Sequence, residues 1–126
     1  MLRGVRGATT IKVNEKEQLF SHTKQLLEEM IHQNNIKAED VASVFVSATP
    51  DVTCAFPAQV VRSLPGWEFV PVMCMQEMAV PGSMPKCIRL MMHVNTDLRQ
   101  QEIHHVYMEN AVSLRPDLST KGDSSK

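Results

Sequence analysis

An arginine lies inside the mostly apolar stretch CIRLMMHV, residues 87–94. A guanidinium keeps its proton when it is buried, so Arg89 needs either an anion or contact with water. Arg89 therefore marks either a structural ion pair or snorkelling edge residue, or a binding site for an anionic ligand. Strand alternation predicts two faces, both at least half buried: Cys87, Arg89, Met91 and His93 on one, and Ile88, Leu90, Met92 and Val94 on the other.

Three further arginines, Arg6, Arg62 and Arg115, also lie beside aliphatic residues, and nearby carboxylates are too few to pair all four. Arginine offers a rigid fork of donors that matches a carboxylate, so several on one sheet could bind a ligand with more than one carboxylate. Separate surface salt bridges explain the same arginines equally well. Glu77 is a carboxylate in apolar company, beside Met73, Cys74 and Met75.

The common catalytic signatures are absent from the sequence. It contains no GxSxG nucleophile motif and no glycine-rich phosphate loop. The cysteines Cys54, Cys74 and Cys87 are odd in number and form no CxxC pair, which predicts reduced thiols and argues against a disulfide framework or a zinc site. The histidines are scattered, so we expect no metal and no cofactor.

Size and charge limit the possible partners. A chain of 126 residues predicts one domain, and its formal net charge of -1 gives no broad field for nucleic acid or an anionic membrane. No apolar run approaches the roughly 20 residues of a membrane span, and the first residues lack the apolar block of a secretory signal. We expect a cytoplasmic protein that binds neither nucleic acid nor membrane.

The periodicity of apolar residues predicts a mixed α+β domain of about five strands, one long helix and short helices. An approximate capping box at Asn14 and Glu17 would begin the long helix, which ends near Asn34 and Asn35. Gly4 and Gly7 predict weak or kinked points in the first strand. The other predicted elements are a buried strand over residues 42–49, a short helix over 56–67, an edge or bulged strand at Pro71, the strand of Arg89, and a last extended segment over 104–116.

Six blocks of the sequence together form a recognisable pattern: RGxRGATT at residues 3–10, SATPD at 47–51, FPAxxVR at 56–62, GWxxVPVxCMQEM at 66–78, KCIRxMM at 86–92 and HVYxExAVxLRPDL at 105–118. These blocks closely resemble the chorismate mutases of the AroH class. The resemblance is collinear and implies a single domain over residues 1–118, followed by a flexible tail over 119–126. It also implies a homotrimer with a barrel-like core of packed sheets and active sites in clefts between subunits.

The reaction implied is the Claisen rearrangement of chorismate to prephenate in the biosynthesis of phenylalanine and tyrosine. One C–O bond breaks while a C–C bond forms, so the reaction needs no nucleophile, proton transfer, metal or cofactor. It needs confinement of a flexible dicarboxylate and positive charge at the ether oxygen. The rival interpretations are a trimeric binding module for a carboxylate metabolite and a purely structural trimer.

The resemblance also implies a role for each matching residue. Arg89 would point at the ether oxygen, and Arg6 and Tyr107 would hold a carboxylate. Glu77 and the Cys74 backbone would hydrogen-bond the ring hydroxyl. The ring would be walled by Phe56, Ala58, Val72, Met73 and Leu114, with Gln59, Arg62 and Arg115 near the mouth.

The implied site is divided between chains. The segment from Phe56 to Cys74 would come from one subunit, and Arg6, Glu77, Arg89, Tyr107 and Arg115 from its neighbour. Two positions depart from the family pattern, because Gln59 stands where lysine is frequent and Met73 where threonine is common. We expect both changes to affect KM more than kcat.

Overall fold

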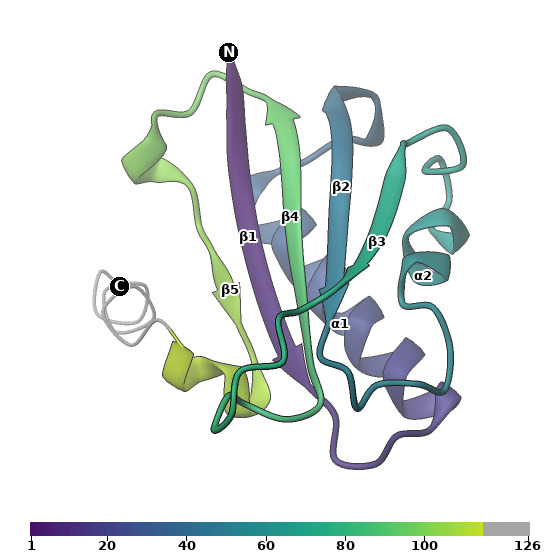
Figure 1. Cartoon of the computed structure of the whole chain (residues 1–126). Helices are drawn as coiled ribbons and strands as arrows, with labels where there is room; N and C mark the ends of the chain where they lie inside the picture. The colour runs from purple at the N-terminus through teal and green to yellow at the C-terminus, as the bar shows by residue number, and fades with distance from the viewer. Residues whose placement is uncertain (115–126) are drawn as a thin grey trace.

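The computed structural model describes residues 1–114 and shows a single five-stranded sheet with strand order β3-β2-β4-β1-β5. The two α-helices lie on the same face of the sheet, behind it in Figure 1, and the opposite face carries neither. No helix in this part of the chain is long and apolar enough to cross a membrane. The strands are β1 (Leu2–Thr10), β2 (Val41–Ala48), β3 (Val72–Gln76), β4 (Cys87–Asn95) and β5 (Val106–Tyr107), and the α-helices are α1 (Lys16–Asn34) and α2 (Ala58–Ser63). The 3₁₀ helices are η1 (Ala38–Asp40), η2 (Gln100–Glu102) and η3 (Glu109–Leu114). The predicted mixed α+β fold is therefore confirmed.

The core lies between the helices and the three long strands. The strands alternate, so side chains on one face of β1, β2 and β4 point into the core that they share with α1 and α2. The largest completely buried side chains include Leu19, Leu26 and Met30 of α1, and Val44 and Met92 of the sheet. This packing leaves the opposite face of the sheet open, and the predicted site residues Arg6 of β1 and Arg89 of β4 lie there.

Gly7 serves close packing and does not kink its strand. All nine residues of β1 pair in register with β4. A Cβ atom at Gly7 would overlap Met30 Sδ and lie 3.1 Å from Leu26 Cδ1, so a side chain at this position would force the side chains of Met30 and Leu26 to move. The predicted weak point is therefore a place where the helix approaches the strand closely.

The predicted capping box at the start of α1 is wrong. The N-cap residue is Glu15, and no side chain caps the helix. Asn14 instead accepts hydrogen bonds from the backbone N–H groups of Thr53 (3.1 Å) and Cys54 (3.2 Å), so it ties the start of the helix to the loop after β2. At the other end, Asn35 adopts the left-handed conformation (φ 55°) and closes the helix where the sequence predicted.

The last extended segment is shorter than predicted. Within residues 104–114 only β5 is a strand, and it pairs in parallel with β1. Glu109 then takes a positive φ of 54° and begins η3, whose Asn110 N–H donates to Thr10 Oγ1 (3.2 Å). The element η3 packs against β1, whereas Arg115 and the predicted tail lie outside the described residues.

The prediction for Pro71 is confirmed. β3 begins at the next residue and occupies an edge of the sheet, paired in parallel with β2. Pro71 precedes the first paired residue of β3, so its missing N–H removes no hydrogen bond from the pairing of β2 and β3. Its carbonyl accepts a hydrogen bond from the Val44 N–H at 2.9 Å. The edge position exposes much of β3.

Candidate active site

The sheet register places Arg89 between two small residues. β4 lies between β1 and β2, and Arg89 pairs with Ala8 on the first and with Ser47 on the second. Both neighbours are short, so the guanidinium can extend over the open face of the sheet. The side chain of Arg89 is 52% exposed in the single chain, whereas Cys87 on the same face is buried and Met91 and His93 are half-buried. The predicted burial of both faces of β4 therefore holds except at Arg89 itself.

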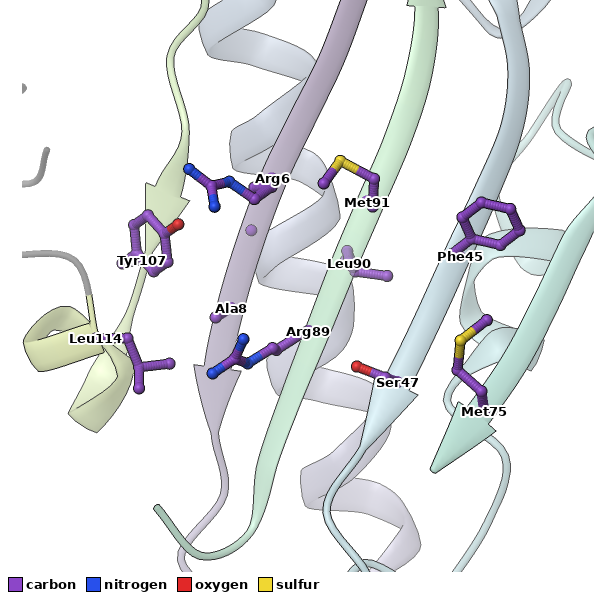
Figure 2. Close-up of a pocket in the computed structure, with 11 residues that line it drawn as sticks. Arg6, Ala8, Phe45, Ser47, Met75, Arg89, Leu90, Met91, Tyr107 and Leu114 are labelled. Atoms are coloured by element: carbon purple, nitrogen blue, oxygen red, sulfur yellow. The ribbon is translucent and has the colours of Figure 1, made fainter. Parts of the chain in front are cut away.

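A cavity of about 270 Å³ lies on this open face. Figure 2 shows the side chains of Arg6, Tyr107, Leu114 and Arg89 gathered at one side of it, over β1, β4, β5 and η3. The structure therefore brings together four residues that sequence analysis assigned to one site. The full lining is Arg6, Gly7, Ala8, Phe45, Ser47, Met75, Arg89, Leu90, Met91, Tyr107 and Leu114.

The charge of the cavity is positive. None of the residues that line it within the described part of the chain is acidic. Arg89 Nε lies 3.5 Å from Glu77 Oε2, but the Arg6 guanidinium forms no ion pair with residues 1–114. Its backbone N–H donates to His105 Nδ1 at 3.0 Å, which ties β1 to the residues before β5. The arrangement suits an anion, because the cavity presents two guanidinium groups and, among residues 1–114, only that of Arg89 has a carboxylate partner.

Glu77 lies beside Arg89 in an adjoining hollow. Arg89 and Leu114 line both spaces, and Glu77, Cys87 and Thr49 line only the second. Glu77 follows the last residue of β3, and its N–H donates to the Ala48 carbonyl at 2.9 Å. The Ser47 hydroxyl donates a hydrogen bond to Glu77 Oε2. Arg89 therefore fits both interpretations made from the sequence: it has an ion-pair partner in Glu77, and it also faces a cavity that could bind an anionic ligand.

Cys87 is the buried cysteine of this region. Burial raises the pKa of its thiol, and the charge of Arg89 only partly offsets this effect. A raised pKa keeps the sulfur protonated at neutral pH, so it is a poor nucleophile. All three cysteines are free thiols, as the sequence predicted.

The remaining predicted site residues within 1–114 do not line this cavity. Phe56 (66% exposed), Gln59 and Arg62 lie at the start and on the surface of α2, and Met73 (60% exposed) and Cys74 are exposed on β3. These elements lie toward the edge of the sheet opposite β5. Val72 is half-buried. Ala58 is 4% exposed and packs in the core of the chain, so it can support the wall from beneath but offers little surface to a ligand.

Sequence analysis missed several residues that line the cavity. Phe45 and Ser47 lie on β2, Met75 on β3 and Met91 beside Arg89 on β4, all on the open face. Alternation within residues 42–49 already puts Phe45 and Ser47 on one face. The missing information was the register between β2 and β4, which is set by contacts between residues far apart in the sequence.

The chain is similar to proteins named chorismate mutase AroH. That of Bacillus subtilis (strain 168) is 56% identical over 119 residues, 94% of each chain. That of Thermus thermophilus is 41% identical over 121 residues, 95% of this chain and 98% of the relative. A solved chorismate mutase from Clostridium thermocellum superimposes with a TM-score of 0.85 at 42% identity, covering 88% of this chain and 98% of that one. The sequence also matches the family chorismate mutase type I over residues 2–118. The family predicted from the six sequence blocks is confirmed: the chain belongs to the type I chorismate mutases.

Proposed function

We propose that this chorismate mutase rearranges chorismate to prephenate in the cavity that Arg6, Arg89 and Tyr107 line on the open face of the sheet. The step leads towards phenylalanine and tyrosine. One observation carries the proposal: two guanidinium groups lie at a cavity without a lining carboxylate, and only Arg89 has an acidic neighbour among residues 1–114. A dicarboxylate substrate supplies the negative charge that this surplus of cations requires.

The chemistry assigns a separate task to each cation. As the C–O bond of the ether breaks, negative charge grows on its oxygen, and Arg89 stabilises that charge from a fixed position on β4. Arg6 binds a carboxylate of chorismate and reaches towards the same oxygen, and Tyr107 helps to hold that carboxylate. The rearrangement is intramolecular and moves no proton, so binding the chair-like conformer and stabilising the oxygen are the whole task.

Glu77 and Leu114 complete this half of the site. Glu77 lies in the adjoining hollow, where its carboxylate accepts a hydrogen bond from the ring hydroxyl of the substrate. Leu114 lines both spaces and forms an apolar wall for the ring. Arg115 follows directly in the sequence, so we place it near the mouth. We also propose that residues 1–118 form the enzyme domain and residues 119–126 a flexible tail.

The other half of the site comes from a neighbouring chain in a homotrimer. Phe56, Gln59, Arg62, Val72, Met73 and the Cys74 backbone lie towards the opposite edge of the sheet and do not line the cavity of their own chain. Ala58 supports Phe56 and Gln59 from the core. The exposed apolar side chains of Phe45, Met73 and Met75 support such packing, because a single chain leaves them in water.

Gln59 and Met73 adjust substrate capture in this arrangement. Gln59 is exposed and neutral, so capture of the dianion depends on Arg62 at the mouth. Met73 is bulkier than threonine and has no hydroxyl. Neither side chain lines the cavity of Arg89, which supports an effect on KM larger than that on kcat. We place the enzyme in the cytoplasm, because a chain with three free thiols suits a reducing compartment.

Turnover of chorismate by the purified chain tests the proposal. The loss of the enol-ether absorbance of chorismate, with prephenate identified as the product, should proceed far above the rate without protein. A binding module for a carboxylate metabolite would bind chorismate and leave that rate unchanged. Binding without turnover would therefore refute the enzymatic function.

A further inference from the structure

We propose that Ser47 is a positioning residue for the rearrangement, because its hydroxyl orients the Glu77 carboxylate beside Arg89. This inference rests on the proposed function and deepens it. It concerns a side chain that does not carry out the chemistry itself. Ser47 acts on the substrate through Glu77.

The sheet register brings the three side chains together. Ser47 is the direct partner of Arg89 in the antiparallel pair of β2 and β4. The parallel pairing of β2 and β3 ends at Ala48 and Gln76, and Glu77 is the next residue. The Glu77 N–H bonds to the Ala48 carbonyl at 2.9 Å, which holds its backbone next to Ser47. In Figure 2 the hydroxyl of Ser47 points from β2 towards the side of Arg89.

The two oxygens of the Glu77 carboxylate differ in their hydrogen bonding to residues 1–114. Glu77 Oε2 accepts the hydrogen bond from Ser47 Oγ and is also the atom nearest to Arg89 Nε, at 3.5 Å. Glu77 Oε1 accepts no hydrogen bond from any residue among 1–114. One oxygen is therefore occupied by the protein, and the other is available to a hydroxyl group of the substrate.

The same hydrogen bond keeps Glu77 from neutralising Arg89. A carboxylate and a guanidinium readily form a pair with two parallel hydrogen bonds, which would direct the cation at Glu77. Here the contact is a longer ion pair, and within the described chain no hydrogen bond joins the two side chains. Because Ser47 restrains Glu77, Arg89 stays available for the ether oxygen.

The replacement Ser47→Ala tests this role. We expect kcat/KM for chorismate to fall about tenfold, within the range for losing a hydrogen bond to a charged group, and most of the loss to be in kcat. Ser47→Thr keeps the hydroxyl and should recover most of the activity. Ser43→Ala is the matched control, since Ser43 lies on the same face of β2 but contacts His93 Nδ1 at 3.1 Å. It should leave kcat and KM unchanged.

A double-mutant cycle separates positioning from general support of the sheet. In a Glu77→Ala background, Ser47→Ala should change kcat less than about twofold, because the group that it orients is gone. An undiminished tenfold loss in that background would overturn the inference, as would full activity of the single Ser47→Ala variant. In both cases turnover by the unmodified chain would leave the proposed function standing. No turnover by the unmodified chain would overturn both.

Discussion

The residues that flank Arg89 in the sheet leave its guanidinium free to reach the cavity. Alternation in residues 87–94 predicted its face, and the motif KCIRxMM predicted its role, but neither could show that Ala8 and Ser47 flank it. Those neighbours lie on strands distant in sequence, and their small side chains leave the guanidinium free to extend over the cavity. Arg89 is more exposed than Cys87, Met91 and His93 on the same face of β4, which neither α1 nor α2 covers (Figure 1).

At this scale we predict that Arg89→Ala lowers kcat by about a hundredfold or more, the scale of removing one preorganised donor to a developing oxyanion. Arg89→Lys should also be poor, because a flexible ammonium does not reproduce the planar fork. Steady-state kinetics with chorismate measure both effects. Arg3→Ala is the control for lost charge, since Arg3 donates to the Leu98 carbonyl and does not line the cavity. Near-normal kcat in either Arg89 variant would refute the assigned role.

At the scale of elements, a clamp of polar groups holds the start of β4. The Cys87 N–H donates to Thr49 Oγ1 at 3.0 Å, and the Lys86 N–H donates to Asp51 Oδ2 at 2.9 Å. The Thr49 hydroxyl donates in turn to Asp51. The clamp joins β2 to β4 close to Arg89. It also accommodates Lys86 at a positive φ of 49°.

Asp51 should make the stability of this clamp depend on pH. Burial raises the pKa of its carboxyl, but the hydrogen bonds from Thr49 and Lys86 outweigh this effect and lower the pKa below 3.8. A lowered pKa in the folded state means that the ionised group stabilises the fold above pH 3.8 and loses this effect as the pH falls through the folded-state pKa.

Asp51 is exposed, so water screens its charge and reduces the effect. We therefore expect Asp51→Asn to lower the free energy of unfolding by no more than about 0.5 kcal/mol at pH 7, with a difference from wild type that shrinks in acid. Urea unfolding at a fixed protein concentration measures the difference at each pH. Glu28→Gln, at an exposed position of α1, is the control and should show no such change. A difference for Asp51→Asn that stays constant down to strong acid would contradict this explanation.

The elements also show what could be predicted from the sequence. The long helix and the strand predicted over residues 42–49 were found because apolar periodicity reports burial directly, although only one face of β2 is buried. The wrong predictions concern residues whose conformation depends on contacts with residues far apart in the sequence. Asn14 matched a local capping pattern but bonds to Thr53 and Cys54 instead. Likewise, the last segment turns at Glu109 because η3 docks on β1, and Gly7 is needed for the approach of Met30.

At the scale of the whole molecule, the chain presents the predicted site in two separate parts. The cavity with Arg6 and Arg89 lies over β1 and its neighbours, whereas Phe56 and Arg62 are exposed at α2, towards the other edge. The family blocks predicted every one of these residues, but one chain does not bring the two parts together. A ring of identical chains could bring the two parts together, because each chain would pair its Arg89 part with one neighbour and its Phe56 part with the other.

Mixing two inactive variants tests this shared site most directly. Arg89→Ala damages one part and Phe56→Asp the other. If a trimer shares its sites, equal mixing of the two chains should restore about a quarter of the wild-type sites, because each mixed trimer contains one intact pair. Mixing Arg89→Ala with Arg6→Ala chains is the control and should restore nothing, since both changes damage the same part. Recovery of chorismate turnover only in the first mixture is the result that we predict. Activity no greater than that of the separate variants, in mixed trimers confirmed by native mass spectrometry, would contradict a site shared between chains.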